Sequence, residues 1–140
     1  MKTRILFAGA ARGELLIATA PLSFWGGVDA TTGRIIAPQH PQCGQYVGHR
    51  LLALPVIIGS SSSSSVLLEL IRCGHAPAGL ILGTVDAILI VGCIVGREMG
   101  YRAPPVVELS ATQIASLTGG RYQLAATGLL TRLSARATPQ

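Results

Sequence analysis

The sequence predicts a single α/β domain with a mixed sheet, built around a central β-α-β unit. The first observation is a pair of continuous apolar runs, Leu51–Ile58 and Ala78–Leu82, whose lack of alternation is typical of strands buried on both faces. The second is the segment between them, where apolar residues within Val66–Ile71 recur at helical spacing. The third is length, because 140 residues suit one domain with a substantial core.

The N-terminal part is expected to consist of short strands and turns. Thr3–Ala8 and Glu14–Thr19 are β-prone runs separated by the glycine-bounded turn Gly9–Gly13, which makes them a candidate hairpin. Asp29–Gly33 is a predicted turn that leads into a short strand. Pro38–Gln45 contains two prolines and a glycine and is predicted to be a loop.

The central part is expected to alternate strands with helices. Pro55 within the first apolar run requires a bulge or an edge position, because proline cannot donate a ladder hydrogen bond. A helix is predicted from Ser63 or Ser64 to Cys73, with serine side chains as N-caps and Gly74 as the residue that ends it.

The following segment is ambiguous between helix and strand. Asp86 could cap a second helix that runs to Met99 and ends at Gly100, whereas Ala87–Val91 fits a strand equally well by periodicity. The remaining predicted elements are the strand Val106–Leu109, the short helical turn Thr112–Leu117, the strand Arg121–Thr127 and a frayed polar tail, Arg132–Gln140.

The composition indicates an aliphatic core and a surface with few charges. Hydrophobic residues make up 49% of the chain, charged residues 12% and aromatic residues only 4%. Such a domain is expected to cover part of its apolar surface against a partner. The net charge is +5, but the basic residues are dispersed singly. This dispersion argues against nucleic-acid binding and favours an anionic small molecule or an acidic partner surface.

The sequence also bears on location in the cell. Arg12 and Glu14 interrupt the N-terminal apolar stretch, so a signal peptide is not expected. The apolar run 87–96 is far shorter than the roughly 20 residues of a membrane span. The three cysteines are widely spaced, which argues against a disulfide framework and against a zinc site in this chain alone, although a metal site shared with another chain stays open. We therefore expect a cytoplasmic, soluble protein.

The strongest candidate site is the serine run, Gly59–Ser65, which lies between the first apolar run and the first helix. Serine runs usually act as flexible linkers, but strand and helix residues flank this one directly. Backbone N–H groups at a helix N-terminus favour a carboxylate or a phosphate. The same positive end stabilises a serine alkoxide and so favours proton abstraction. The alternative is a loop selected only for small side chains.

Two further loops contain candidate binding residues. Trp25 either packs on the rim of the core or, with Gly26 and Gly27, forms a bend that approaches a ligand. His40 is expected to be exposed and functional because it lies in a proline-rich loop. The chain has no Ser-His-Asp order, no phosphate-binding glycine motif and no paired carboxylates, so it looks like half of an active site.

Several short segments occur in an order and spacing that are together specific. They are Leu22–Asp29, Thr32–Ile36, His40–Pro41, Gly44–Gln45, Leu54–Pro55, Gly59–Ser60, Val66–Leu70 and Gly74–Ala78. In this order they resemble the swivelling domain of the aconitase X family, over most of the chain.

The resemblance implies a swivelling β/β/α domain that acts as a small subunit docked on a large catalytic subunit. The large subunit would carry an iron or iron–sulfur centre, and this chain alone would bind no cofactor. Family members are hydro-lyases; one type dehydrates cis-3-hydroxy-L-proline to Δ1-pyrroline-2-carboxylate, and another dehydrates mevalonate 5-phosphate.

The resemblance also implies roles for individual residues. Ser60, directly after Gly59, would be the base that removes the proton α to a carboxylate. Many members carry a second glycine in this loop, where this chain has serine, so the choice among the serines stays open. The resemblance implies substrate binding by Ser61. Together with the loop residues proposed above, the candidate substrate-binding residues are Ser61, Gly59, Trp25, Gly26, Gly27 and His40.

Three functions therefore remain as expectations. The hydroxyproline reaction comes first, because the chain has no phosphate clamp beyond the serine run. The mevalonate 5-phosphate reaction comes second. A non-catalytic module that binds an anion or acts as a scaffold is the alternative from another class. In all three cases no membrane or nucleic-acid partner is expected.

Overall fold

The computed structural model describes residues 1–134 and contains seven strands and four helices. The strands are β1 (Arg4–Phe7), β2 (Ala11–Ile17), β3 (Leu51–Leu54), β4 (Gly79–Leu82), β5 (Val106–Glu108), β6 (Arg121–Leu124) and β7 (Leu130–Arg132). The helices are α1 (Phe24–Gly27), α2 (Ser63–Cys73), α3 (Ala87–Glu98) and α4 (Ala111–Ala115). Within the described part of the chain, no helix has both the length and the apolar character needed to cross a bilayer.

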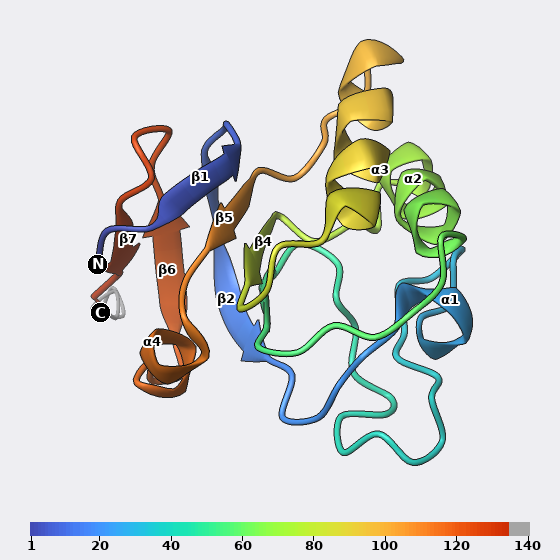
Figure 1. Ribbon diagram of the computed structural model, residues 1–140, viewed down its shortest axis with the longest axis horizontal. Helices are drawn as coiled ribbons and strands as arrows, with labels where there is room; N and C mark the ends of the chain where they lie inside the picture. The colour runs from blue at the N-terminus through green and yellow to red at the C-terminus, as the bar shows by residue number, and fades with distance from the viewer. Residues whose placement is uncertain (135–140) are drawn as a thin grey trace, which may run out of the picture.

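The strands form one mixed sheet in the order β1-β5-β4-β3-β2-β6-β7. The four inner strands β2, β3, β4 and β5 are parallel, and β1, β6 and β7 pair antiparallel at the two sides. Helix α2 connects β3 to β4 and α3 connects β4 to β5, and both helices pack together on one face of the sheet (Figure 1). This arrangement confirms the predicted α/β domain with a mixed sheet around a central β-α-β unit.

Side chains that alternate along β3 divide the core into two clusters. Leu52 and Leu54 belong to the cluster beneath the helices, together with Leu67 of α2. Leu51 and Ala53 belong to a second cluster on the opposite face of the sheet. Because successive strand residues point to opposite faces, a strand buried on both sides must be apolar throughout. This explains the unbroken apolar sequence.

The sheet is curled, and its two edges meet at the N-terminus. Lys2 forms an antiparallel bridge with Leu129, and the Met1 amino group donates a hydrogen bond to the Leu130 carbonyl oxygen at 2.7 Å. The backbone at the two edges is therefore paired over this stretch rather than left open.

The predicted N-terminal hairpin is wrong. β1 pairs with β5, whereas β2 pairs with β3 and β6. Because the sheet is curled, the link Ala8–Ala10 joins two strands that are not neighbours in the sheet, instead of forming a turn between two paired strands. Gly13 lies inside β2, where a Cβ atom would lie 2.4 Å from the His49 carbonyl oxygen. The glycine is therefore required for a close backbone approach and does not mark a turn.

The turn and loop that follow are present, with little strand between them. The carboxylate of Asp29 accepts hydrogen bonds from the Thr31 hydroxyl (2.7 Å) and the Thr31 N–H (2.8 Å), which lower the pKa of Asp29. The short strand expected after this turn is reduced to isolated bridges, Val28 with Ile35 and Arg34 with Tyr46.

The central strand is shorter than predicted. β3 ends at Leu54, directly before Pro55, so a central position is compatible with proline and no bulge is needed. The chain then leaves the sheet, and Ile57 forms only an isolated bridge with Leu22.

Helix α2 has the predicted limits, and α3 ends at Glu98, one residue before the predicted end at Met99. Gly74 ends α2 with a left-handed φ of 78°. The ambiguous segment is helical, and the Asp86 carboxylate accepts hydrogen bonds from the N–H groups of Ile88 (2.8 Å) and Leu89 (3.1 Å). Ser62 precedes α2, but its side chain forms no cap hydrogen bond, so serine capping is wrong at this position.

The C-terminal part contains one strand more than expected. The predicted strand Arg121–Thr127 ends at Leu124, and the chain then turns into β7. Arg132 is thus the last residue of a strand, not the start of a frayed tail. Residues 135–140 of that tail lie outside the described residues.

Candidate active site

The serine run lies at the edge of the sheet where the parallel strands β3 and β4 end. It connects the carboxyl end of β3 to the N-terminal end of α2. Ligands of open α/β sheets bind at this edge, because helix N-termini and loops converge there. Figure 1 shows α1 beside this end of α2, so the two loops predicted to bind substrate lie together.

A hydrogen bond joins these two loops. The backbone N–H of Trp25 donates to the Ser63 hydroxyl at 3.2 Å, and the Ser23 hydroxyl donates to the Trp25 carbonyl oxygen at 2.9 Å. Sequence reasoning missed Ser23 and singled out no role for Ser63. No local signal could identify them, because Trp25 and Ser63 are far apart in sequence.

Gly59 adopts a backbone conformation that other residues would strain to adopt. Its φ is 149°, and a Cβ atom there would lie 2.6 Å from the Ser23 hydroxyl oxygen and 2.9 Å from that of Ser63. Glycine therefore lets the serine run approach the α1 loop closely.

Ser60 forms the turn that starts α2. Its carbonyl oxygen accepts a hydrogen bond from the Ser63 N–H at 3.0 Å, and its hydroxyl oxygen accepts one from the Ser62 N–H at 3.1 Å. The residue is exposed. The Ser60 oxygen thus lies beside a backbone donor near the positive end of a helix, where negative charge is stabilised.

The other serines differ in exposure and hydrogen bonding. Ser63 is buried with 6% of its surface exposed, and the Ser64 hydroxyl donates to the Ser61 carbonyl oxygen at 3.0 Å. Ser61 is exposed and precedes the helix, whereas Ser65 is exposed within the first turn of α2. The structure therefore leaves Ser60 and Ser61 as the exposed loop serines in front of the helix.

The α1 segment separates the two aromatic residues. Phe24 lies in the core with 1% of its surface exposed, whereas Trp25 is 59% exposed. Gly26 has a left-handed φ of 76°, and a Cβ atom added to it would meet no other atom within 4 Å, while Gly27 is buried against Leu22. The bend predicted at this site is present, and Trp25 and Gly26 face open space.

His40 is buried, so the expectation that it is exposed was wrong. Its Nδ1 accepts a hydrogen bond from the Gln42 N–H at 3.1 Å, which leaves Nε2 protonated to donate to the Ala20 carbonyl oxygen, also at 3.1 Å. Both ring nitrogens therefore hold backbone groups of the surrounding loops. A direct role of His40 in substrate binding stays a prediction.

The residues before the serine run are more exposed than the sequence indicated. Val56 is 50% exposed and Ile58 is 53% exposed. Pro55 ends the strand, and the apolar residues after it leave the sheet. A pocket of about 480 Å³ lies beside this segment, lined mainly by apolar residues that include Ala18, Pro55 and Val56. Exposed apolar residues therefore directly precede the row of hydroxyl groups.

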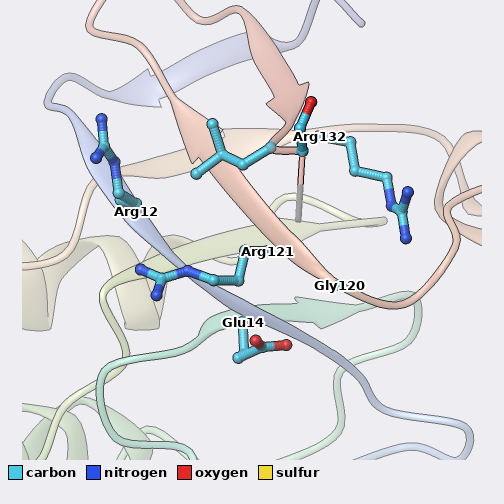
Figure 2. Close-up of a pocket in the computed structure, with 7 residues that line it drawn as sticks. Arg12, Glu14, Gly120, Arg121 and Arg132 are labelled. Atoms are coloured by element: carbon cyan, nitrogen blue, oxygen red, sulfur yellow. The ribbon is translucent and has the colours of Figure 1, made fainter. Parts of the chain in front are cut away.

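A second pocket, of about 610 Å³, lies on β2, β6 and β7 and contains none of the predicted site residues (Figure 2). It is lined by Arg12, Glu14, Arg121 and Arg132, among others. In Figure 2 the guanidinium groups of Arg121 and Arg132 point away from each other. The cationic side chains do not converge on one ligand position, and we assign this pocket no role in the reaction.

Possible metal ligands are scattered over the structure. Among residues 1–134, no three His, Cys, Asp or Glu side chains lie close enough together to hold a metal ion. Cys43 is exposed, Cys73 is half-buried and Cys93 is buried. The donor set of these residues does not fit an iron centre held by this chain alone.

Comparison with known proteins gives consistent results. A family model described as the aconitase X swivel domain matches residues 1–127. The chain is 46% identical over 128 residues to the cis-3-hydroxy-L-proline dehydratase of Pseudomonas aeruginosa, a match that covers 86% of this chain and 22% of that protein. It is 39% identical over 115 residues to the phosphomevalonate dehydratase small subunit of Methanopyrus kandleri, covering 79% of this chain and 85% of that subunit.

The relatives differ in length. The chain spans about a fifth of two proteins named cis-3-hydroxy-L-proline dehydratase, 22% of the P. aeruginosa protein and 19% of the Hypocrea jecorina protein. A crystal structure of Thermococcus kodakaraensis aconitase X in its holo form superimposes with a TM-score of 0.82 at 30% identity, covering 95% of this chain and 97% of that chain. The chain belongs to the aconitase X swivel domain family.

Proposed function

We propose that this chain is the small subunit of an aconitase X-type dehydratase and is active only with a large catalytic subunit. Its best-supported reaction is the dehydration of cis-3-hydroxy-L-proline to Δ1-pyrroline-2-carboxylate. The observation that carries the proposal is the 46% identity to a protein named cis-3-hydroxy-L-proline dehydratase, over 86% of the chain. The 85% coverage of a protein named as a small subunit supports the two-chain arrangement.

Ser60 is the proposed base. In the reaction the Ser60 oxygen takes the proton from the carbon α to the substrate carboxylate, and the neighbouring C–O bond breaks as the hydroxyl group takes up a proton and leaves as water. The carbon–carbon double bond that forms belongs to an enamine, which becomes Δ1-pyrroline-2-carboxylate when a proton leaves nitrogen and another is added at the carbon that carried the hydroxyl group. The Ser62 N–H, 3.1 Å from the Ser60 oxygen, and the N-terminal end of α2 stabilise the alkoxide form that removes the proton.

Ser61 and the backbone of the run are the proposed carboxylate-binding groups. Within the described residues, the N–H groups of Ser60 and Ser61 donate no hydrogen bond to the protein. Two free donors and the Ser61 hydroxyl beside a helix N-terminus suit a carboxylate. Gly59 brings this loop close to α1, and the exposed Trp25 ring offers an apolar wall for the substrate ring.

The iron or iron–sulfur centre implied by the family resemblance is proposed to lie in the partner subunit, and the scattered His, Cys, Asp and Glu side chains of residues 1–134 fit that placement. Such a centre would supply Lewis-acid chemistry at the leaving hydroxyl group. The steps assigned to this chain are proton removal by Ser60, carboxylate binding by the serine run and, when the subunits close, exclusion of water from the site.

Mevalonate 5-phosphate is the second candidate substrate. The M. kandleri protein named phosphomevalonate dehydratase small subunit supports it, since 85% of that subunit is matched. However, segments 18–28 and 55–66, which form the candidate site, contain no Lys or Arg to neutralise a phosphate. This charge distribution, together with the higher identity to the hydroxyproline enzyme, favours the hydroxyproline reaction.

Replacing Ser60 with Ala in the two-subunit complex tests the catalytic assignment. We expect kcat to fall by about 100-fold or more while the complex still assembles, because a general base typically contributes that much. Ser65→Ala is the matched control, since Ser65 is also exposed but belongs to α2, and it should leave kcat nearly unchanged. An unchanged kcat in the Ser60 variant would exclude Ser60 as the base.

A further inference from the structure

Helix α3 carries an apolar face that points to solvent. The α3 face, as we call it, comprises Val91, Ile94, Val95 and Met99, which are 49%, 43%, 38% and 58% exposed. These residues recur at helical spacing, so they share one side of the helix. Segment 87–96 contains no charged residue. A helix that is apolar all round is normally buried, and a solvent-facing helix normally has a polar outer side.

The neighbouring helix, α2, shows that a helix in this layer can have a polar outer side. α2 packs beside α3 on the same face of the sheet. Its apolar residues Leu67 and Leu70 are buried, and its outer side carries an ion pair between Glu69 and Arg72. The outer surfaces of these two adjacent helices therefore differ: α2 carries an ion pair, whereas α3 exposes four apolar residues and is charged only in its last turn, at Arg97 and Glu98.

The α3 face is fixed in position relative to the serine run. Gly92 of α3 lies against the backbone of Ser64, where an added Cβ atom would lie 3.0 Å from the Ser64 carbonyl oxygen. At Gly96, one turn further along α3, an added Cβ atom would lie 3.2 Å from the side chain of Ile71 in α2. Because the two helices are packed so tightly, a partner bound to the α3 face would hold the serine run at a defined position.

We propose that the α3 face is the surface on which the large catalytic subunit docks, an inference that rests on the proposed function. The matching region is 22% of one chain in the P. aeruginosa relative but 85% of a separate small subunit in the M. kandleri relative. In the first case most of the enzyme lies outside the matched region within the same chain. A small subunit on a separate chain has no covalent link to the large subunit, so it must bind the large subunit through its surface. The α3 face provides an apolar surface for this binding.

The size of the helix sets the extent of this interface. A stable interface buries about 800 Å² on each partner, more than one face of a helix about 18 Å long can supply. The interface therefore extends beyond α3. Val85 (46% exposed), next to the N-cap Asp86, adds an apolar side chain at the N-terminal end of α3. Charged residues placed at the centre of the α3 face should then prevent docking.

The test is the double variant Val91→Glu, Val95→Lys, co-expressed with the large subunit. The new pair has the i, i+4 Glu–Lys spacing that stabilises a helix, and the net charge does not change. We expect the chain to keep its circular dichroism spectrum and thermal midpoint but to lose co-purification, with the Kd raised about 100-fold or more. The control is the charge swap Glu69→Lys, Arg72→Glu on α2, which should leave the Kd unchanged.

Two results would overturn the inference. One is wild-type affinity of the Val91/Val95 double variant for the large subunit. The other is a wild-type chain that sediments alone as a dimer which the double variant converts to monomer, since the face would then bind a second copy. The two proposals can fail independently. An unchanged kcat in Ser60→Ala would contradict the catalytic role of Ser60 but not the docking proposal. Normal docking by the Val91/Val95 double variant would contradict the docking proposal but not the role of Ser60.

Discussion

Gly59 and Ser60 act together at the scale of single residues. Gly59 has a positive φ and no space for a Cβ atom, and this lets the chain pass close to Ser23 and Ser63. Ser60 follows at once, exposed and with its oxygen beside the Ser62 N–H. The reactivity proposed for Ser60 thus depends on the glycine before it and on the helix after it.

Cys93 should make the stability of the protein depend on pH. Burial raises the pKa of this thiol to about 12, with Arg97 opposing the shift. The folded chain therefore keeps the thiol neutral, whereas the unfolded chain ionises it above its ordinary pKa of about 9. The stabilising contribution is complete below that value and is lost as the pH rises towards 12.

Urea unfolding of wild type and Cys93→Ala measures this effect. The stability difference between the two should shrink by about 1 kcal/mol between roughly pH 8 and pH 10, because only the wild type has the thiol that titrates on unfolding. A constant difference between wild type and Cys93→Ala would show that the thiol is not shielded from water in the folded protein.

Single residues were only partly predictable from the sequence. The serine run was identified because it lies between a strand and a helix, which is local information. The burial of His40 was not predictable, because its hydrogen-bond partners include Ala20, on a different loop. The same applies to Ser63, whose hydroxyl accepts from Trp25. Contacts between distant loops determine which of several similar side chains are buried or hydrogen-bonded. The composition of a loop does not reveal such contacts.

At the scale of elements, the central helices and strands were predictable because their signals are local. The helical spacing of apolar residues and Gly74 defined α2. The length of β3 was overestimated, because periodicity cannot show where a buried run leaves the sheet, and Pro55 marks that point only once the strand is known to be central. The α3 segment was ambiguous because a helix with apolar residues on all sides has no periodicity to detect.

The two helix N-termini differ in capping, which gives a paired prediction. Replacing Asp86 with Ala should reduce the free energy of unfolding by about 1 kcal/mol, since its carboxylate accepts two backbone hydrogen bonds at the start of α3. Ser62→Ala, at the corresponding position of α2, should change it far less, because the Ser62 side chain makes no cap hydrogen bond. Chemical denaturation of both variants measures the difference. Equal losses would contradict the assignment of these caps.

At the scale of the whole molecule, the order of the strands was the least predictable feature. β1 and β2 are separated by three residues, yet they pair with different strands, because the curled sheet brings its two edges together at Lys2 and Leu129. In a flat sheet, a short link that contains glycine joins two paired strands as a hairpin. In a curled sheet, the same link can join two strands that do not pair with each other. The curl itself depends on strands contributed by both ends of the chain, including β7, which the sequence did not indicate.

The whole molecule has the features expected of one half of an enzyme. The serine run contains the proposed base and anion-binding groups, the apolar α3 face is the proposed docking surface, and in the described residues no three His, Cys, Asp or Glu side chains cluster as a metal site. Each half should therefore be inactive without the other. The family relationship fits this division, because the matched region is a minor part of some relatives and a separate subunit in others.

The most direct measurement is the rate of Δ1-pyrroline-2-carboxylate formation from cis-3-hydroxy-L-proline by the purified chain, by the large subunit and by the two combined. We predict that neither protein alone forms product, that the combination turns over, and that mevalonate 5-phosphate is a much poorer substrate. Full activity of the large subunit alone, or a combined preparation inactive on both substrates, would contradict the proposal that this chain is half of a dehydratase.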